Sequence, residues 1–348
     1  MPGNGCWSFW HSTASRPYPP CLKRLGGDVS ETGVQVARRR LGRTGLEVSE
    51  LGYGSWGLGG GQWLGQDDEE GLRALNRGLD LGINFIDTAL AYGSGHSERL
   101  VGQVLAARPG EAYVATKIPP KNGEWPGRGD VSVEDVFPAD YVIECTETSL
   151  RNLGLEQVEV QQLHVWHDNW LDGSWREAAE QLKRDGKVRF FSVSIDAPED
   201  ALEVVRAGAV DTVQVVYNIV TASPADELFG VCAANDVGVI ARVPFDEGSL
   251  TGKVTPETEF EAGDWRNLYF TPEVKADRWE RVQGIVSELG IELDELPELA
   301  LRFCLSSAEV STVIPGMRKV RNVEANVAAA AKGPLDAQTL EVLAKYRR

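Results

Sequence analysis

The sequence predicts an α/β fold, a (β/α)8 TIM barrel with an N-terminal hairpin at the barrel bottom and long loops at the C-terminal face. Eight short β-branched runs alternate with segments of helical period from Arg40 onward, as in βα units around a parallel sheet. A chain of 348 residues with 42% hydrophobic content can bury a core of that size. The first strand is not followed by G-x-G-x-x-G, which disfavours the doubly wound Rossmann alternative.

The first 36 residues are expected to form an extension outside the barrel, which would occupy residues 37–348. This segment has no periodicity and holds Pro17, Pro19 and Pro20 within four positions, so we expect it to be disordered. It lacks the apolar core of a secretory signal. Its few basic residues and lack of acids before Asp28 leave an organellar address open.

The barrel elements follow in order along the chain. "RRRLGRTGLEV" (38–48) predicts a hairpin. The expected strands are 49–56, 83–89, 112–117, 158–166, 188–195, 212–219, 238–245 and 310–316. The expected helices are 67–82, 97–107, 139–154, 174–186, 198–208, 224–236, 276–290, 296–306 and 320–332. Several of these helices begin at Ser, Asp or Pro and end near Gly, as capping requires.

Two connections are unusually long, at 118–139 and 246–277. The first is rich in Pro, Gly and Trp. Long loops in a compact domain are usually functional lids. We therefore expect both segments to cover a binding site.

Composition excludes several classes of protein. Acidic residues outnumber basic ones by 52 to 35, a net charge of −17 that disfavours binding to nucleic acid or anionic membranes. No apolar run reaches the about 18 residues of a membrane span. Five scattered cysteines without a C-x-x-C pair predict neither a disulfide framework nor a metal site, so a cytoplasmic location is expected.

Titratable residues fall at successive strand ends. In "NFIDTALAYGSGHSERL", Asp87 closes the second predicted strand and Tyr92 lies in the loop that follows. Lys117 closes the third strand, and His164 lies near the end of the fourth. Because a (β/α)8 barrel carries its chemistry at the C-terminal ends of its strands, these four side chains are expected to converge on one mouth.

The four residues suit proton transfer to a carbonyl oxygen. A lysine beside a phenol can lower the pKa of Tyr92, while Asp87 neutralises and orients Lys117. His164 could then hold the substrate oxygen in position. Taken singly, an Asp at a strand end is more often a helix cap, and a lone Lys or His is more often structural. Their joint placement favours an active site.

From about Arg38 onward the chain resembles the aldo-keto reductase superfamily. The similar segments are "RRLGRTGLEVSELGYGSWGLGG", "GINFIDTALAYGSGHSERLVGQVL", "VATK", "SLRNLGLEQVEVQQLH" and "STVIPG". The resemblance implies an oxidoreductase whose catalytic residues are Asp87, Tyr92, Lys117 and His164. It also implies a nicotinamide cofactor, usually NADPH with NADH as the alternative, bound without a Rossmann domain.

The resemblance assigns cofactor contacts to the later strand ends. Ser194 and Gln214 would hold the carboxamide, and Tyr217 would stack under the nicotinamide ring. The pyrophosphate would lie along "VPFDEGSLTGK" and the adenosine against "IPGMRKVRNVEAN", with Arg318 at the 2′-phosphate, where its planar fork suits two oxygens. The residues implied in these two segments are Pro244, Gly248, Leu250, Lys253, Gly316, Arg318, Asn322 and Asn326.

Departures from the family pattern concern the cofactor more than the chemistry. Ile195 stands where the family has Asn, and Val243, Asp246 and Glu247 change the phosphate loop and bring acids toward it. In the adenosine segment the usual Gln and Glu are replaced by Asn322 and Ala325.

Aromatic walls are common in carbonyl and sugar sites, so the tryptophans of the predicted mouth are expected to contact substrate. They are Trp56, Trp63, Trp125 and Trp166, with His167 beside the last.

The sequence therefore predicts reduction of aldehydes or ketones, including sugar-derived ones, to alcohols, with a small carbonyl compound as the partner. One alternative is a non-catalytic cofactor-binding regulator resembling potassium-channel β subunits. A second is a Schiff-base lyase or aldolase that uses Lys117 as its amine. The physiological substrate and the oligomeric state stay open.

Overall fold

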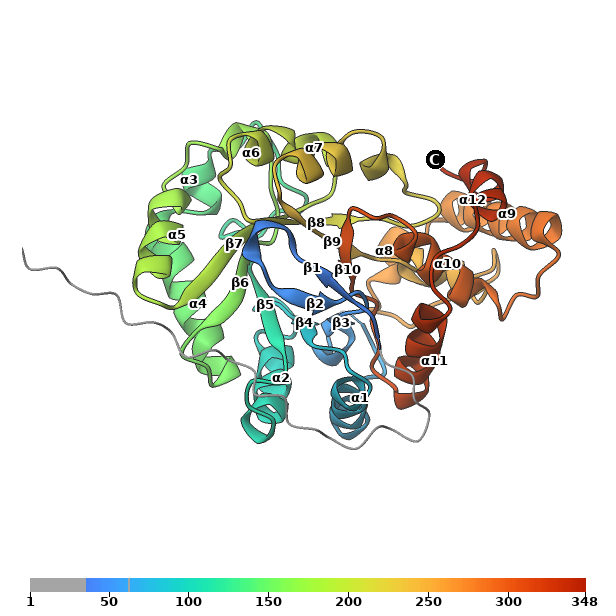
Figure 1. Cartoon of the computed structure of the whole chain (residues 1–348), viewed down its shortest axis with the longest axis horizontal. Helices are drawn as coiled ribbons and strands as arrows, with labels where there is room; N and C mark the ends of the chain where they lie inside the picture. The colour runs from blue at the N-terminus through green and yellow to red at the C-terminus, as the bar shows by residue number, and fades with distance from the viewer. Residues whose placement is uncertain (1–35, 62) are drawn as a thin grey trace, which may run out of the picture.

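The computed structural model describes residues 36–61 and 63–348 and forms one (β/α)8 barrel (Figure 1). Eight parallel strands follow one another around the sheet in chain order. They are β3 (Tyr53–Gly54), β4 (Phe85–Asp87), β5 (Tyr113–Ile118), β6 (Val158–Leu163), β7 (Val188–Ile195), β8 (Thr212–Val216), β9 (Gly238–Arg242) and β10 (Val310–Val313). The predicted fold class is confirmed.

The first and last strands meet and close the barrel. Leu51 bridges Val313 in parallel, and Gly54 bridges Gly316. The Gly54 N–H donates to the Pro315 carbonyl at 3.0 Å. A Cβ at Gly54 would lie 2.6 Å from the Ile314 carbonyl oxygen, so this close approach of two backbones requires glycine. Closure leaves the eight strand ends in a ring around one mouth.

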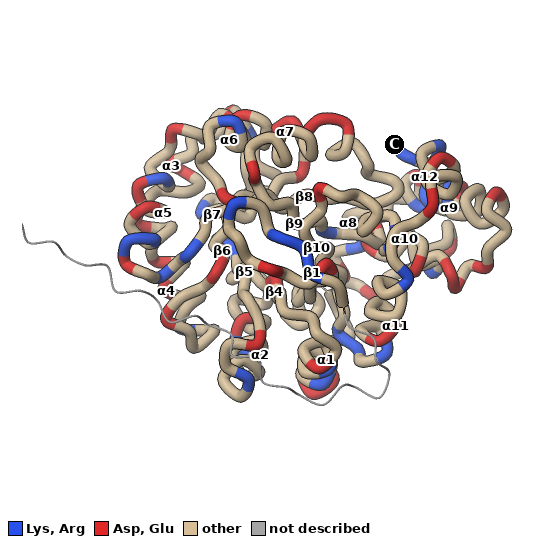
Figure 2. Tube along the Cα trace, in the orientation of Figure 1, with Lys and Arg blue, Asp and Glu red and all other residues tan. Residues whose placement is uncertain are grey.

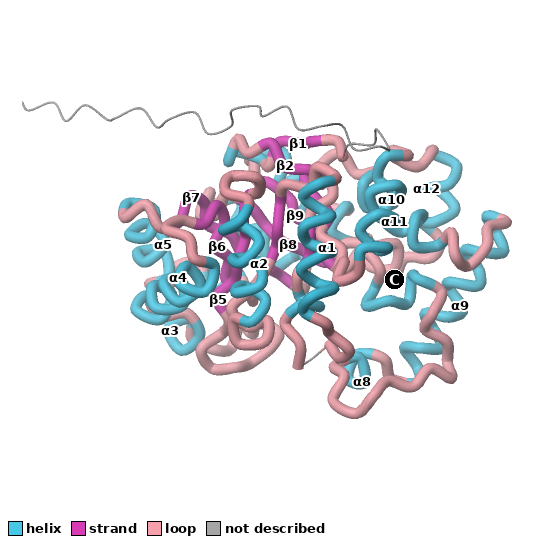
Figure 3. The backbone as a smooth tube through the Cα atoms, turned by 90° about the horizontal axis from the view of Figure 1, so that it is seen from below, coloured by secondary structure: helices cyan, strands magenta, loops and turns pink. Residues whose placement is uncertain are grey.

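Most helices cover the outside of the ring, whereas α8 lies at the end opposite the hairpin (Figures 1 and 3). They are α1 (Asp68–Asp80), α2 (His96–Ala107), α3 (Val133–Val136), α4 (Ala139–Leu153), α5 (Trp175–Arg184), α6 (Leu202–Arg206), α7 (Leu228–Ala234), α8 (Arg266–Tyr269), α9 (Pro272–Leu289), α10 (Leu296–Leu305), α11 (Val320–Ala331) and α12 (Ala337–Ala344). The N-cap of α1 is the Asp67 carboxylate, which accepts the Glu70 N–H at 3.0 Å. Acidic and basic residues are interspersed over these helices, as Figure 2 shows.

The predicted hairpin is present and closes the bottom of the barrel. Its strands β1 (Arg38–Arg40) and β2 (Glu47–Ser49) pair antiparallel, at the end opposite α8 in Figure 3. Three apolar hairpin residues pack inside the barrel against side chains from the strands. The cluster comprises Leu41, Leu46, Val48, Phe85, Ala115, Val160, Ile240 and Ile314. Residues two positions further along those strands point the same way, toward the mouth.

The predicted extension falls almost entirely on residues 1–35, which lie outside the described residues, so the domain boundary stays a prediction. No helix among residues 36–61 and 63–348 combines the length and the apolar character that a membrane crossing needs. Cys145, Cys232 and Cys304 are buried free thiols.

Arg39 links the hairpin by hydrogen bonds to the segment between α10 and β10, and its removal is expected to destabilise the fold. Its guanidinium donates to the carbonyls of Leu305, Ser307 and Val310 at 2.7 to 2.9 Å. Arg39→Ala should lower the free energy of unfolding by about 2 kcal/mol, because these acceptors lose a charged donor. Urea unfolding measures the change. Arg38→Ala, at an exposed position of the same strand, is the control, and equal losses would contradict this role.

Candidate active site

The centre of the mouth is a buried ion pair between Lys117 on β5 and Asp87 on β4. Both residues are inward-facing because they follow Ala115 and Phe85 of the interior cluster by two positions. The ammonium also donates to the Thr88 carbonyl at 2.8 Å and to the Tyr92 hydroxyl at 3.2 Å. Lys117 is 0% exposed, so all three contacts are made away from water.

The second carboxylate oxygen of Asp87 is bound by two amides. Gln162 Nε2 lies 3.1 Å from Asp87 Oδ2, and Gln214 Nε2 lies 2.7 Å from it. The two glutamines are joined to each other at 3.3 Å. The carboxylate is therefore fixed from β6 and β8 as well as by the lysine. Burial by itself would lower the pKa of Lys117, but Asp87 and Tyr92 outweigh it, so the pKa of Lys117 is raised and the ammonium stays charged.

Tyr92 lies over this pair but is not a phenolate. Burial raises the pKa of Tyr92, and Lys117 opposes that shift without reversing it. The expected fall in the pKa of Tyr92 is therefore wrong, because the loss of hydration outweighs the effect of the lysine. A protonated phenol at neutral pH is a competent proton donor.

His164 completes the group of four residues. Its ring lies 5.6 Å from the Tyr92 ring, centre to centre. Burial, with the charges of Lys117 and Arg242, holds the pKa of His164 well below its usual value, so the imidazole is neutral. Its Nδ1 atom is buried without a hydrogen-bond partner among the described residues. The structure thus brings the four predicted catalytic residues to one place.

Three of the four predicted tryptophans surround these residues. Trp56 lies 6.2 Å from the Tyr92 ring and 5.3 Å from Trp63. Trp125 stands edge-on to His164 at 4.6 Å and is 50% exposed. Trp265, from the second long loop, packs 5.5 Å from Trp56 and was missed in the sequence, although its loop was recognised. These rings form an aromatic wall around the mouth.

Trp166 does not belong to this wall, so its assignment to substrate contact is wrong. It is 2% exposed and packs edge-on against Trp170 and Trp175, outside the barrel. Strand β6 ends at Leu163, so the inward alternation no longer applies at residue 166. The neighbouring His167 accepts a hydrogen bond from the Asn169 N–H at 3.1 Å, beneath the loop that carries Trp125.

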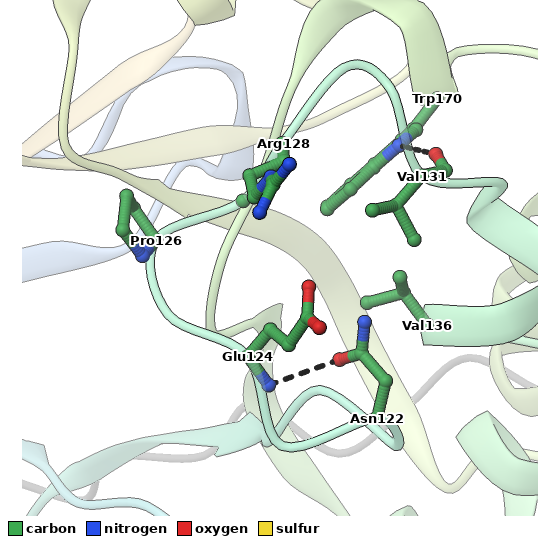
Figure 4. A pocket seen from close by; sticks show the side chains of 8 residues that line it. Asn122, Glu124, Pro126, Arg128, Val131, Val136 and Trp170 are labelled. Carbon is green, nitrogen blue, oxygen red and sulfur yellow. Dashed lines mark hydrogen bonds between the residues drawn. The ribbon is translucent and has the colours of Figure 1, made fainter.

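The loop that carries Trp125 is fastened to the barrel at its far end. Trp170 Nε1, from the segment after β6, donates to the Val131 carbonyl at 2.9 Å, while within the loop the Glu124 N–H donates to Asn122 Oδ1 at 3.1 Å (Figure 4). The small hollow beside these two contacts is lined by Asn122, Glu124, Pro126, Gly127, Arg128, Val131, Val136 and Trp170. None of the four catalytic residues lines it, so this hollow supports the loop rather than the chemistry.

Tyr217 faces away from the mouth. Its ring is 5% exposed and packs against Phe229 of α7 and Phe303 of α10. It lies three positions after the inward-facing Gln214, and an odd step places a side chain on the opposite face of a strand. The expected stacking of Tyr217 under a nicotinamide ring is therefore not supported. Arg242, at the end of β9, follows the inward-facing Ile240 by two positions, so its side chain starts inward, and it was not among the residues predicted for the site.

The loop after β9 is strained and anchored from below. Val243, Asp246, Glu247 and Gly248 all have positive φ, between 45° and 109°. Such conformations cost about 1–3 kcal/mol for non-glycine residues. Asp246 accepts hydrogen bonds from Arg278 Nε at 2.7 Å and from the Tyr269 and Ser249 hydroxyls at 2.6 Å. Its carboxylate is paired with Arg278 of α9, so it does not act as a free negative charge beside the predicted pyrophosphate position.

Glu247 is the acid that stays near the mouth. Burial raises the pKa of Glu247 to about 7; Arg242 opposes the shift, Asp246 adds to it and Arg266 opposes it. A substantial fraction of this carboxyl group is therefore neutral at neutral pH. Of the two acids in this loop, neither places a full negative charge in the mouth.

Unsatisfied donors and basic groups fit the mouth for a polar, anionic cofactor. Besides His164 Nδ1, the buried atoms Arg242 Nε and Trp265 Nε1 have no partner among the described residues. Arg318 donates to the Leu64 carbonyl at 2.7 Å and makes no ion pair within the described chain. Buried polar groups are normally hydrogen-bonded, so these donors indicate a ligand.

Comparison with known proteins identifies the family. The family model named Aldo/keto reductase family matches residues 50–347. The holo form of aldo-keto reductase AKR11C1 from Bacillus halodurans superposes with a TM-score of 0.71 at 28% identity, covering 90% of this chain and 97% of that one. NADH-specific methylglyoxal reductase from Escherichia coli K12 is 28% identical over 305 residues, 83% of this chain and 92% of that protein.

A further relative is not named as an enzyme. A probable voltage-gated potassium channel subunit beta from rice is 28% identical over 309 residues, 84% of this chain and 90% of that protein. The fold and the four residues at its mouth define an NAD(P)H-dependent oxidoreductase built on a (β/α)8 barrel. The chain belongs to the aldo/keto reductase family, which confirms the resemblance seen in the sequence.

The buried pair of Asp246 and Arg278 is expected to hold the loop after β9 in its strained form. Arg278→Met would leave the Asp246 carboxylate buried without its cation, which should cost about 3 kcal/mol or more in the free energy of unfolding. Cofactor affinity should fall as well, because the loop relaxes. Arg73→Met, which breaks the exposed Arg73–Glu70 pair, should cost at most about 1 kcal/mol. Equal losses in urea unfolding would rule out the anchoring role.

Proposed function

We propose that this chain reduces aldehydes or ketones to alcohols, with Tyr92 as the proton donor. The observation that carries the proposal is the Tyr92 hydroxyl, 3.2 Å from an ammonium that is itself fixed by Asp87. A phenol above a buried cation can release its proton, because the cation stabilises the phenolate left behind. When bound, the reduced nicotinamide supplies a hydride to the carbonyl carbon.

His164 is proposed to orient the substrate. A neutral imidazole can form a hydrogen bond to a carbonyl oxygen without carrying a charge that would compete with Lys117. It stands between Tyr92 and Trp125, with ring separations of 5.6 and 4.6 Å. An oxygen placed between His164 and Tyr92 therefore meets both groups, while the ring of Trp125 covers the outer side.

Residues at the later strand ends are proposed to hold the cofactor. Ser194 is buried near the C-terminal end of β7, and the Gln214 amide nitrogen donates to Asp87, which leaves the Gln214 amide oxygen for a carboxamide. Lys253 is exposed beside the strained loop. The Arg318 side chain lies against Gly57, where an added Cβ would be 3.3 Å from Arg318 Cδ. The full proposed set is Ser194, Gln214, Pro244, Gly248, Leu250, Lys253, Gly316, Arg318, Asn322 and Asn326.

The substrate is proposed to be a small carbonyl compound held by Trp56, Trp63 and Trp125. Flat aromatic or sugar-derived carbonyls fit such walls, because ring faces pack well on indole. A cytoplasmic location agrees with the free thiols of Cys145, Cys232 and Cys304, since reduced cysteines are typical of that compartment.

Similarity to a potassium-channel β subunit supports one other candidate function, cofactor binding without turnover. The protonated Tyr92 above Lys117 favours the enzyme, since a regulator does not require a proton donor. Steady oxidation of reduced cofactor with an aldehyde panel decides between them. The Schiff-base alternative is disfavoured because Lys117 is a buried ammonium with three acceptors, and a protonated amine is not a nucleophile.

Removing the Tyr92 hydroxyl should abolish reduction and spare cofactor binding. Tyr92→Phe deletes the proton donor, so kcat is expected to fall by roughly 10²–10⁴-fold. The dissociation constant of the reduced cofactor, followed by fluorescence, should change less than about threefold. Tyr346→Phe, which removes a hydroxyl bonded to Glu288, is the control. A Tyr92→Phe enzyme with near wild-type turnover would defeat the assignment.

Arg318 should favour NADPH over NADH. Replacing a guanidinium that pairs with a 2′-phosphate removes charge-assisted hydrogen bonds, so Arg318→Gln should weaken NADPH by roughly tenfold to a hundredfold. NADH, which lacks that phosphate, should be nearly unaffected. Arg321→Gln, exposed in the same segment, controls for general charge. If both cofactors weaken equally in Arg318→Gln, the 2′-phosphate contact is excluded.

A further inference from the structure

Arg242 places a positive charge across the mouth from the ion pair of Lys117 and Asp87. It ends β9, two positions after Ile240 of the interior cluster, so its side chain starts inward. Its Nη2 atom donates to the Ile195 carbonyl at 3.0 Å and to Asp196 Oδ1 at 2.5 Å, both just at the end of β7. The guanidinium therefore spans the end of β8, which lies between those two strands.

One side of this guanidinium has no protein partner. Arg242 Nε is buried and makes no hydrogen bond with the described residues. The ion pair with Asp196 uses Nη2 alone, and the Asp196 side chain is 51% exposed. Water screens that carboxylate strongly, so it compensates the guanidinium poorly inside the mouth.

The charge of Arg242 reaches the reacting groups. It contributes to lowering the pKa of His164 and opposes the rise in the pKa of Tyr92. Lys117 is different, because its charge is matched by a carboxylate as deeply buried as itself. Arg242 thus adds a positive charge to the mouth that is matched less closely than the charge of Lys117.

We propose that Arg242 sets the relative affinity of the site for the two redox states of the nicotinamide cofactor, by disfavouring the oxidised one. This inference rests on the proposed function. The oxidised ring is a cation and the reduced ring is neutral, so only the oxidised ring is repelled. A ring that reacts with a carbonyl bonded to Tyr92 has its reacting carbon about 3–3.5 Å from that carbonyl, within the field that acts on Tyr92.

Two consequences follow for the reaction. The oxidised cofactor, which is the product of carbonyl reduction, is held weakly and leaves readily, and product release limits turnover in many enzymes. Weaker binding of the oxidised cofactor also shifts the equilibrium of the bound nicotinamide couple toward its reduced form. Each tenfold excess of the oxidised dissociation constant over the reduced one raises the potential of the bound two-electron couple by about 30 mV.

The test measures the ratio of the dissociation constants of NADP⁺ and NADPH, by calorimetry or fluorescence with the full chain at fixed ionic strength. Arg242→Gln keeps an amide donor and removes the charge, so the ratio should fall by about tenfold. Arg242→Lys keeps the charge and should leave the ratio within about threefold of the wild-type value. Asp196→Asn removes a carboxylate that water already screens, so it should leave the ratio within about threefold of the wild-type value. Arg189→Gln, on the exposed start of β7, is the control and should change nothing.

An unchanged ratio in folded Arg242→Gln overturns the proposal, and so does an equal fall in Arg242→Gln and Arg242→Lys, which would indicate shape rather than charge. If Arg242→Gln does not fold, Arg242→Met, which also removes the charge and keeps a long unbranched side chain, decides, and an unchanged ratio there overturns the proposal. Failure of the proposed function looks different, because a wild-type chain that binds neither NADPH nor NADH, or that binds but turns over no carbonyl, fails before the ratio is compared.

Discussion

The site depends on one ammonium group that cannot reach water. Lys117 is completely buried at the centre of the barrel, where an unpaired charge would be prohibitively costly. Asp87, the Thr88 carbonyl and the Tyr92 hydroxyl supply its three acceptors. Because these acceptors come from β4 and the loop after it, the loop conformation that presents Tyr92 is linked to keeping the ion pair satisfied. The same contacts that make the buried charge tolerable hold the phenol in place.

Alternation along the strands explains why this much was predictable. On three strands, an apolar residue in the interior beside the hairpin is followed at steps of two by polar residues nearer the mouth. These sets are Phe85 and Asp87, Ala115 and Lys117, and Val160, Gln162 and His164. Once the strands are located in the sequence, this alternation therefore also predicts which polar side chains face the mouth. The same rule would have placed Arg242 above Ile240 and turned Tyr217 outward, had it been applied past the catalytic four.

Loops were predictable in existence and not in detail. The lengths of 118–139 and 246–277 marked them, but which tryptophan would face Tyr92 depends on backbone paths without a period. Trp166 went outward because β6 had already ended, whereas Trp265, the N-cap residue of α8, packs 5.5 Å from Trp56. Substrate preference is determined by these loops. Substrate preference is consequently the part of the function that the alternation along the strands does not predict.

The charge that the loop after β9 presents to a ligand depends on the surroundings of its acidic side chains as much as on their number. Asp246 and Glu247 are adjacent acids, yet one is neutralised by Arg278 while the other has a pKa raised to about 7. Counting both as full charges beside a pyrophosphate overstates the repulsion. The cations Arg242 and Arg318 each keep guanidinium nitrogens without protein partners. A mouth inside a chain of net charge −17 can therefore still attract an anionic cofactor, because short-range, poorly screened charges outweigh the distant surface.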